Sequence, residues 1–292
     1  MSIEEQYLNA LSHKKTLEVK NKFDIKSLHK MPKFFNWVTC EVASGTEFMM
    51  YLAGGDDGIA LRFFWNGCYE PFSTKIWAHY SKNKKNIIID IGSHTGAYTL
   101  TSLACGAKNV VSFEPYFMNF SRQLMNIRGN GFNTEKIFML GIGDANRTEV
   151  LSVSTSLDYL STGGKIGART GSMNFPVNIV AIDNFFELQI HKIDMIKIDV
   201  EGYEDKVLSG AKRTIEKNLP ILFFECLSNE IGDLVYKQLK PLGYKFWEID
   251  DSLETITLVD EIKAAVNLNG EINMSKLNRI ASCSMLEIDG IK

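Results

Sequence analysis

The chain has 292 residues, of which 45% are hydrophobic and 23% are charged, and its formal net charge is −3. This length suits one large domain or two small ones, and the weak negative charge provides no general field for nucleic acid. The five cysteines are scattered, without a Cys-x-x-Cys pair. The polar N-terminus has no apolar signal core, and no apolar run approaches the ~20 residues of a membrane span. We therefore predict a reduced, cytoplasmic protein with no structural zinc, nucleic-acid partner or membrane span.

The N-terminal part of the chain predicts a small cap. Residues 1–40 are polar and mixed, and they predict short helical pieces that end near Pro32. The segment EFMMYLAGGDDGIALRFFW predicts two strands around a Gly-Asp-Asp-Gly turn, because Gly and Asp tolerate the positive φ of a tight hairpin. Pro71 suits the first turn of a following helix. We assign residues 1–85 to the cap and 86–292 to the main domain.

Strands and helices alternate after the cap, which predicts right-handed βαβ crossovers and a doubly wound α/β sheet. The continuous apolar character of the strand candidates suits strands that are buried on both faces. These candidates are Ile87–Ile91, Asn109–Phe113, Lys136–Ile142, Met195–Val200 and Pro220–Cys226.

Two later regions depart from this alternation. The segments TEVLSV and FPVNIVAI predict two extra strands around a long polar loop. The segments YKFWEID and IASCSMLEI predict a terminal strand pair, with a helix-bearing insertion between them.

The stretch NIIIDIGSHTGAYTL predicts a strand that ends in a nucleotide-binding turn. In the NAD pattern Gly-x-Gly-x-x-Gly, the second glycine lets the pyrophosphate touch the backbone. His94 occupies that position here and Ala97 the third, so the imidazole would fill the space of the pyrophosphate. The remaining pattern of Asp90, Gly92 and Gly96 suits S-adenosylmethionine, which carries an amino acid where NAD carries phosphates.

Two further strand ends are candidates for binding the adenosine part. Glu114 follows the next strand, where a carboxylate accepts ribose hydroxyls in dinucleotide folds. Since both cofactors use such a carboxylate, Glu114 indicates adenosine without choosing between them. At the end of the third strand, Ile142 is a candidate to pack on adenine and Asp144 to reach its amino group. A core residue and a turn aspartate would fit these two positions equally well.

The sequence resembles the FkbM family of class I methyltransferases over residues 67–226. The resemblance is carried by Tyr69-Glu70, IDIGSHTGAYT, the FEP segment that ends at Pro115, the pair Asn126/Asn130, and IKIDVEGYEDKVLSGA followed by PILFFE. In the turn, Ser93 and His94 replace the Ala-Asn that is usual in the family.

The resemblance implies a Rossmann-like class I fold, with a mostly parallel seven-stranded sheet and an N-terminal helical and hairpin cap. It also implies S-adenosylmethionine-dependent O-methylation of a small-molecule or glycan acceptor. The acceptor would be a sugar hydroxyl in capsule or lipopolysaccharide biosynthesis, or a natural-product hydroxyl. The expected cofactor-binding residues are Glu70, Asp90, Gly92, Ser93, His94, Gly96, Glu114, Pro115, Ile142, Asp144 and Asp199.

The expected chemistry lies outside the carboxyl ends of the strands, where ligands bind in open α/β sheets. Methyl transfer requires donor and acceptor to be aligned and a proton to be removed from the hydroxyl. Glu201 is the preferred base, because it lies in the turn after its strand. Asp199 suits either a helix N-cap or a direct role, and His94 is a less favoured base. Glu225 ends an apolar strand and therefore needs a partner, which could be substrate, a cation or arginine.

Asp199, Glu201 and Glu225 could also gather Mg²⁺, although the sequence does not require a metal. Two other functions stay open: a Rossmann oxidoreductase, which His94 disfavours, and a non-catalytic cofactor-binding partner. The determinants of the acceptor are expected in residues 154–174, the N-terminal segment and residues 250–280. The sequence contains no indication of oligomeric state.

Overall fold

The computed structural model describes residues 1–17, 23–43, 45–153, 160, 163–189, 191–267 and 269–288. Part of the predicted polar loop after TEVLSV, residues 154–159 and 161–162, lies outside the described residues.

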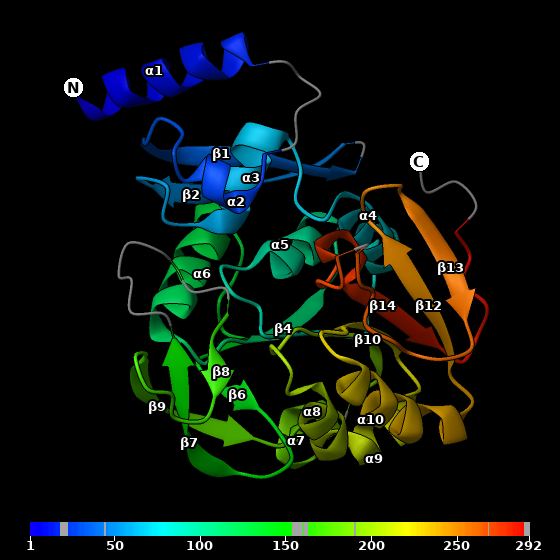
Figure 1. Ribbon diagram of the computed structural model, residues 1–292. Coiled ribbons are helices and arrows are strands. Elements are labelled where there is room, and N and C mark those ends of the chain that lie inside the picture. The colour runs from blue at the N-terminus through cyan, green and yellow to red at the C-terminus, as the bar shows by residue number, and fades with distance from the viewer. Residues whose placement is uncertain are drawn as a thin grey trace.

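A large sheet of eight strands forms the centre of the molecule, in the order β13-β12-β14-β11-β10-β3-β4-β5 (Figure 1). The strands from β11 to β5 run parallel, whereas β14, β12 and β13 are antiparallel. This arrangement confirms the doubly wound, mostly parallel α/β fold, with β13 as an added edge strand. The bounds are β3 Ile87–Ile91, β4 Asn109–Phe113, β5 Ile137–Phe138, β10 Ile193–Ile198, β11 Ile221–Glu225, β12 Lys245–Asp250, β13 Thr255–Val259 and β14 Asn278–Ser282.

Helices cover both faces of this sheet (Figure 1). On one face lie α4 Pro71–Ser81, α5 Ala97–Ala104 and α6 Phe117–Gly129. On the other lie α7 Phe186–Gln189, α8 Glu204–Gly210, α9 Lys212–Asn218 and α10 Asn229–Leu239, with the 3₁₀ turns η1 Ile182–Asn184 and η2 Lys240–Leu242 nearby.

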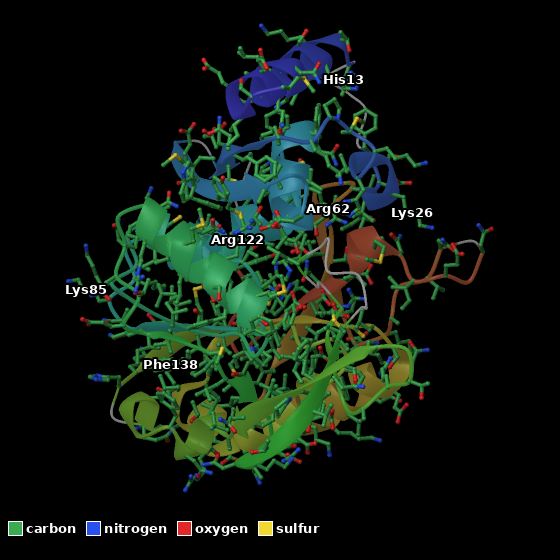
Figure 2. All side chains as sticks on the ribbon, turned by 90° about the vertical axis from the view of Figure 1, so that its left-hand side faces the viewer. His13, Lys26, Arg62, Lys85, Arg122 and Phe138 are labelled. Carbon is green, nitrogen blue, oxygen red and sulfur yellow. The ribbon has the colours of Figure 1, made fainter. Side chains whose placement is uncertain are left out.

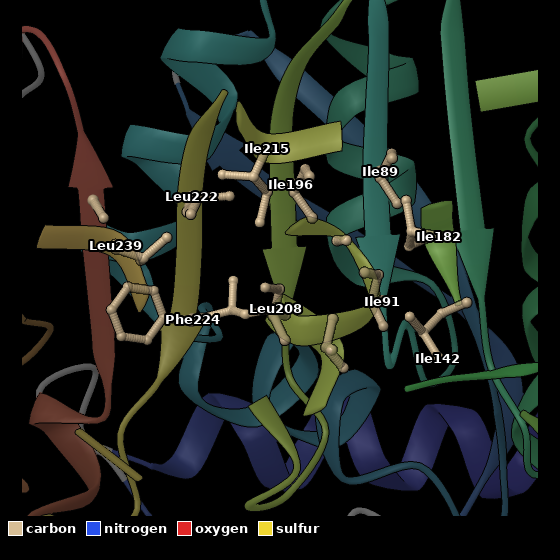
Figure 3. Close-up of a cluster of buried hydrophobic side chains, with 14 of the residues drawn as sticks. Ile89, Ile91, Ile142, Ile182, Ile196, Leu208, Ile215, Leu222, Phe224 and Leu239 are labelled. Carbon is tan, nitrogen blue, oxygen red and sulfur yellow. The ribbon is translucent and has the colours of Figure 1, made fainter. Parts of the chain in front are cut away.

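Successive strand residues pack into different cores, as expected for strands buried on both faces. Ile89, Ile196 and Leu222 belong to the cluster that Figure 3 shows, together with side chains of α8, α9 and α10. Ile88 and Met195 belong to the cluster on the opposite face.

Two predictions on strand boundaries need correction. The strand predicted over residues 136–142 is divided, because β5 ends at Phe138 and β6 Gly141–Ile142 pairs with a second sheet. The insertion predicted to carry a helix contains β13 and the 3₁₀ turn η3 Met274–Lys276, and its described residues form no α-helix. The period-two segment TITLV pairs with β12 instead.

The second sheet has the order β6-β9-β7-β8. Its long antiparallel pair, β7 Arg147–Val153 and β9 Met173–Val180, confirms the two extra strands that the sequence predicted. β8 Lys165–Ile166 adds a short edge.

The N-terminal region consists of α1 Ile3–Thr16, α2 Ile25–Leu28, the hairpin β1 Phe35–Ala43 and β2 Thr46–Ala53, and α3 Gly58–Asn66. The predicted hairpin around Gly-Asp-Asp-Gly was wrong, since the chain after this turn is helical. Asp57 starts the helix: its Oδ1 accepts the backbone N–H groups of Ile59 at 2.8 Å and Ala60 at 3.2 Å.

Polar side chains of α6 attach this hairpin to the rest of the molecule. Asn126 and Asn130 lie one turn apart and accept the backbone N–H groups of Tyr51 and Met49, at 2.8 Å and 2.7 Å. Arg122 donates to the Tyr51 carbonyl at 2.8 Å, and Figure 2 shows its place on α6. The asparagine pair therefore binds the edge of β2. The domain boundary at residue 85 stays a prediction.

Gly92 begins the turn after β3 and has φ +77°. A Cβ at this position would lie 1.7 Å from the carbonyl oxygen of Asp199, which follows the neighbouring strand β10. The glycine is thus required by the close approach of two strand ends, in addition to its positive φ.

We predict that Gly92→Ala prevents folding or lowers the free energy of unfolding by more than about 4 kcal/mol, because the new methyl group overlaps backbone. Gly67→Ala is the matched control, since Gly67 has φ +76° and no atom within 4 Å of a Cβ. It should lower the free energy of unfolding by only about 1 kcal/mol. Urea unfolding of both variants tests this, and equal losses would contradict the steric explanation.

Candidate active site

The register of the parallel strands brings predicted site residues together at the carboxyl ends of these strands, which form one edge of the sheet. The last paired residues are Ile91 with Phe113, Ile91 with Ile198, and Ile198 with Phe224. The residues that follow these strand positions therefore lie side by side: Gly92, Glu114, Asp199 and Glu225.

A cavity of about 450 Å³ opens at this edge. Its lining contains most of the predicted site residues, namely Glu70, Asp90, Gly92, Ser93, His94, Glu114, Pro115, Ile142, Asp199, Glu201 and Glu225. Gly96 and Asp144 do not belong to this lining. Gly96 is the N-cap residue of α5, with φ +97°. Asp144 pairs with Arg147 at 2.6 Å, and its contact with adenine stays a prediction.

Asp90 is the penultimate residue of β3, and its side chain is buried. Its Oδ2 accepts the hydroxyl of Thr99 at 2.6 Å, whereas its Oδ1 is buried without a hydrogen-bond partner among the described residues. Burial raises the pKa of Asp90, and Lys197 and Thr99 oppose this rise. A buried, unpaired carboxylate oxygen in a cavity wall is suited to a cationic ligand group.

Glu114 fixes the turn after β3 from the neighbouring strand end. Its two oxygens accept the backbone N–H groups of His94 at 2.9 Å and Tyr116 at 2.8 Å. Burial raises the pKa of Glu114 to about 7 despite these hydrogen bonds. His94 has φ +50°, an uncommon conformation for a non-glycine residue, and its Nδ1 lies 3.1 Å from the hydroxyl of Thr95.

Ser93 and Pro115 complete this wall of the cavity. The Ser93 hydroxyl lies 3.1 Å from Gln123 Oε1 and 3.2 Å from the Phe113 carbonyl, so it is directed into the protein.

Glu70 enters the cavity from the N-terminus of α4, with φ +42°. Its Oε2 accepts the Tyr98 hydroxyl at 2.5 Å and the Asn278 side-chain amide at 3.0 Å. Asp251 caps α4 by accepting the backbone N–H group of Ser73 at 2.8 Å. Asp251 and Asn278 come from the C-terminal part of the chain, and sequence reasoning missed both because no local pattern marks them.

Three carboxylates gather after β10 and β11. Oxygens of Asp199, Glu201 and Glu225 lie within 4.8 Å of one another. Burial and then Asp199 raise the pKa of Glu201 to about 7. The same two causes raise the pKa of Glu225 well above its usual value. Mg²⁺ at these carboxylates stays a prediction, since proximity alone does not distinguish a metal site from a proton-sharing cluster.

Lys197 supplies positive charge to this cluster, and sequence reasoning missed it. Its side chain is 4% exposed, and its Nζ lies 2.5 Å from Asp199 Oδ2 and 4.4 Å from the ring centroid of Tyr98. Burial lowers the pKa of Lys197, but the nearby carboxylates, Asp199 first, outweigh this and raise it above its usual value. A lysine within the apolar strand MIKIDV was the available signal, because lysine is almost never fully buried without a partner.

The structure shows the surroundings of three acidic residues. The interpretation of Asp199 as a helix N-cap was wrong: α8 has Tyr203 at this position and no side-chain cap, and Asp199 pairs with Lys197. Glu204, in the first turn of α8, is buried and accepts the Gly202 N–H at 3.1 Å. Glu225 has no ion pair with an arginine in the described part of the chain.

We predict that Lys197→Met lowers the free energy of unfolding by about 3 kcal/mol or more, because it leaves buried carboxylates without their cation. Lys192→Met is the control: Lys192 is 67% exposed and lies 3.9 Å from Asp194, so its loss should cost less than about 1 kcal/mol. Urea unfolding measures both. Similar values for the two variants would show that the buried pair does not support the fold.

Comparison with known proteins identifies the family. The family model described as the methyltransferase FkbM domain matches residues 90–254, so the chain belongs to the FkbM methyltransferase family. This confirms the resemblance read from the sequence. No curated protein matches the chain.

Solved structures show weaker likenesses. An FkbM methyltransferase from Methylobacillus flagellatus is 16% identical, with a TM-score of 0.41, over 77% of this chain and 53% of the other, so this chain spans about half of that protein. A putative methyltransferase from Streptococcus mutans, in complex with SAH, is 10% identical, with a TM-score of 0.41, over 72% of this chain and 94% of the other. An rRNA methylase from Streptococcus thermophilus is 11% identical, with a TM-score of 0.40, over 72% of this chain and 92% of the other. These values are too low to transfer an activity.

No helix among the described residues is long and apolar enough to cross a membrane. The predicted absence of a nucleic-acid partner and the predicted cytoplasmic location stay predictions.

Proposed function

We propose that the protein is an S-adenosylmethionine-dependent O-methyltransferase that acts on a sugar hydroxyl, in capsule, lipopolysaccharide or natural-product biosynthesis. The observation that carries this proposal is that two sets of residues line the same cavity. Asp90 and Glu114 surround the turn after β3, and the cluster of Asp199, Glu201 and Glu225 adjoins it. A donor site and a candidate base are therefore adjacent.

The charge of the cavity favours S-adenosylmethionine over NAD. Its lining contains two cations, Lys197 and Arg62, and seven carboxyl groups, those of Glu70, Asp90, Glu114, Asp199, Glu201, Glu225 and Asp251. Such a surface attracts the sulfonium and ammonium groups of S-adenosylmethionine and repels a pyrophosphate. The free Oδ1 of Asp90 would hold the ammonium group, Glu114 the ribose hydroxyls and Ile142 the adenine. An oxidoreductase is therefore the weaker alternative.

When bound, the cofactor supplies a methyl group that is already activated. The task of this chain is then to orient the acceptor hydroxyl and to take its proton. Glu201 is the proposed base, because a pKa of about 7 leaves it partly ionised near neutral pH. The raised pKa of Glu225 favours its protonated form, and in that form it can donate a hydrogen bond to the acceptor. Lys197 holds Asp199 in place beside both. This complete arrangement also argues against a non-catalytic binding protein.

We predict that calorimetric titration shows binding of S-adenosylhomocysteine and no binding of NAD. Asp90→Asn should weaken the binding of S-adenosylhomocysteine about tenfold or more, because the ammonium group loses a charged partner. Asp183→Asn is a control that removes a carboxylate away from the cavity lining. Binding of NAD alone would overturn the proposed function.

We predict that Glu201→Gln lowers turnover by about 10²- to 10⁴-fold and leaves the binding of S-adenosylhomocysteine unchanged. In the unmodified protein, kcat/KM should rise with pH and level off above about 7, because the base must be ionised. A methyl-release assay against sugar nucleotides and glycan fragments provides the measurement.

The exposed Glu216 on α9 offers the control variant Glu216→Gln, which should keep full turnover. If Glu201→Gln retains turnover, Glu201 is not the base, and His94 becomes the next candidate.

A further inference from the structure

We propose that Arg62 forms an anion-binding subsite of the cavity, and that the acceptor carries a phosphate or carboxylate group besides the hydroxyl that is methylated. This inference rests on the proposed function, because it names the chemical class of its acceptor. It goes beyond the family assignment, since Arg62 lies outside the matched residues 90–254.

One face of α3 forms a wall of the cavity. Ile59, Arg62 and Asn66 line it, and their spacing places them on the same side of a helix. The amide of Asn66 is engaged by the backbone of Phe23, with hydrogen bonds of 2.9 Å and 3.0 Å. Arg62 is therefore the polar side chain on this wall that is left to meet a ligand. Figure 2 shows Arg62 on α3, next to α2.

The guanidinium group of Arg62 has no counter-ion in the described structure. The side chain is half-buried, and no ion pair or hydrogen bond joins it to another described residue. Arg62 makes a cation–π contact with the ring of Tyr69, whose centroid lies 5.8 Å from the guanidinium carbon. A partly desolvated cation gains from an anionic partner, and the planar guanidinium fork matches the oxygens of phosphate and carboxylate.

Tyr69 lines the same cavity as Arg62 and the acidic cluster. Burial raises the pKa of Tyr69, and Glu70, Asp199 and Glu225 raise it further, whereas Arg62 lowers it. The tyrosine ring therefore experiences both charges. An acceptor could place its hydroxyl at the carboxylates and its anionic group at Arg62, with its body along Tyr69.

A second cation acts on the same surroundings as Arg62. Burial lowers the pKa of His29, and both Lys33 and Arg62 lower it further, so these two cations lie near the same histidine. The acidic cluster would repel an anion, and these cations would hold it away from the reacting centre. This division of charge orients an acidic acceptor in one direction.

The test is a calorimetric titration of the full chain, with and without saturating S-adenosylhomocysteine. Three probes are compared: glucose 1-phosphate, glucuronate and the neutral methyl glucoside. We expect the unmodified protein to bind at least one anionic probe more tightly than the neutral one. The preferred probe tells a phosphate acceptor from a carboxylate acceptor.

Arg62→Gln should weaken the binding of the preferred anionic probe about 10- to 100-fold and leave the binding of the neutral probe unchanged. The affinity of Arg62→Lys for this probe should lie between those of the unmodified protein and Arg62→Gln, because lysine keeps the positive charge but lacks the planar guanidinium group. Arg128→Gln, on the exposed surface of α6, is the matched control and should bind like the unmodified protein.

Equal binding of all three probes, no binding of either anionic probe, or unchanged anion binding by Arg62→Gln would each overturn the subsite. The binding of S-adenosylhomocysteine is measured in the same experiment and reports on the proposed function separately. Anion binding lost with Arg62 would support the subsite even in a protein that fails to bind S-adenosylhomocysteine.

Discussion

The buried ion pair of Lys197 and Asp199 is the interaction on which the candidate site depends. Carboxylates from several chain segments meet at one edge of the sheet, and their mutual repulsion would oppose folding without a cation among them. Lys197 comes from the middle strand of this group, so its charge reaches Asp199 on its own strand and Glu70 and Glu225 from elsewhere. Burial raises the pKa values of Glu201 and Glu225, and Asp199 raises them further, since one cation does not balance every carboxylate. The proposed base obtains its pKa from burial and from this imbalance.

Backbone strain accompanies this charge arrangement. Glu70, His94 and Glu201 all line the cavity and all have positive φ, which non-glycine residues seldom adopt. Each is held by its surroundings: Tyr98 and Asn278 bind Glu70, Glu114 binds the N–H group of His94, and the buried Glu204 supports the turn that carries Glu201. Residues held in such conformations are concentrated at functional sites in proteins. The strain at these three positions therefore supports the location of the site independently of the sequence motifs.

The cap and the C-terminal segment complete the cavity that the sheet edge begins. Wall residues include Arg62 from α3 and Met274 and Leu277 from the C-terminal part. The prediction that acceptor determinants lie in the N-terminal segment and in residues 250–280 is consistent with these positions. Asp251 joins the two parts, because it caps α4 of the N-terminal part. Acceptor recognition is thus expected to depend on segments that flank the family's common region.

The sequence by itself determined the parallel strands, the glycine turn after β3 and the carboxylates at the strand ends. Its signals there are local: apolar runs define strands, and Asp90, Gly92 and Glu114 occupy set positions after them. The hairpin predicted at Gly-Asp-Asp-Gly does not form, because Asp57 caps a helix there instead. Turns and helix N-termini favour the same residue types, so the sequence did not distinguish them. Only the tertiary structure decided that Gly92 faces the Asp199 carbonyl, that Lys197 is the buried cation, and that Asp251 and Asn278 hold the start of α4. Except for the pair of Lys197 and Asp199, these contacts join residues far apart in the chain, and no local sequence pattern marks them.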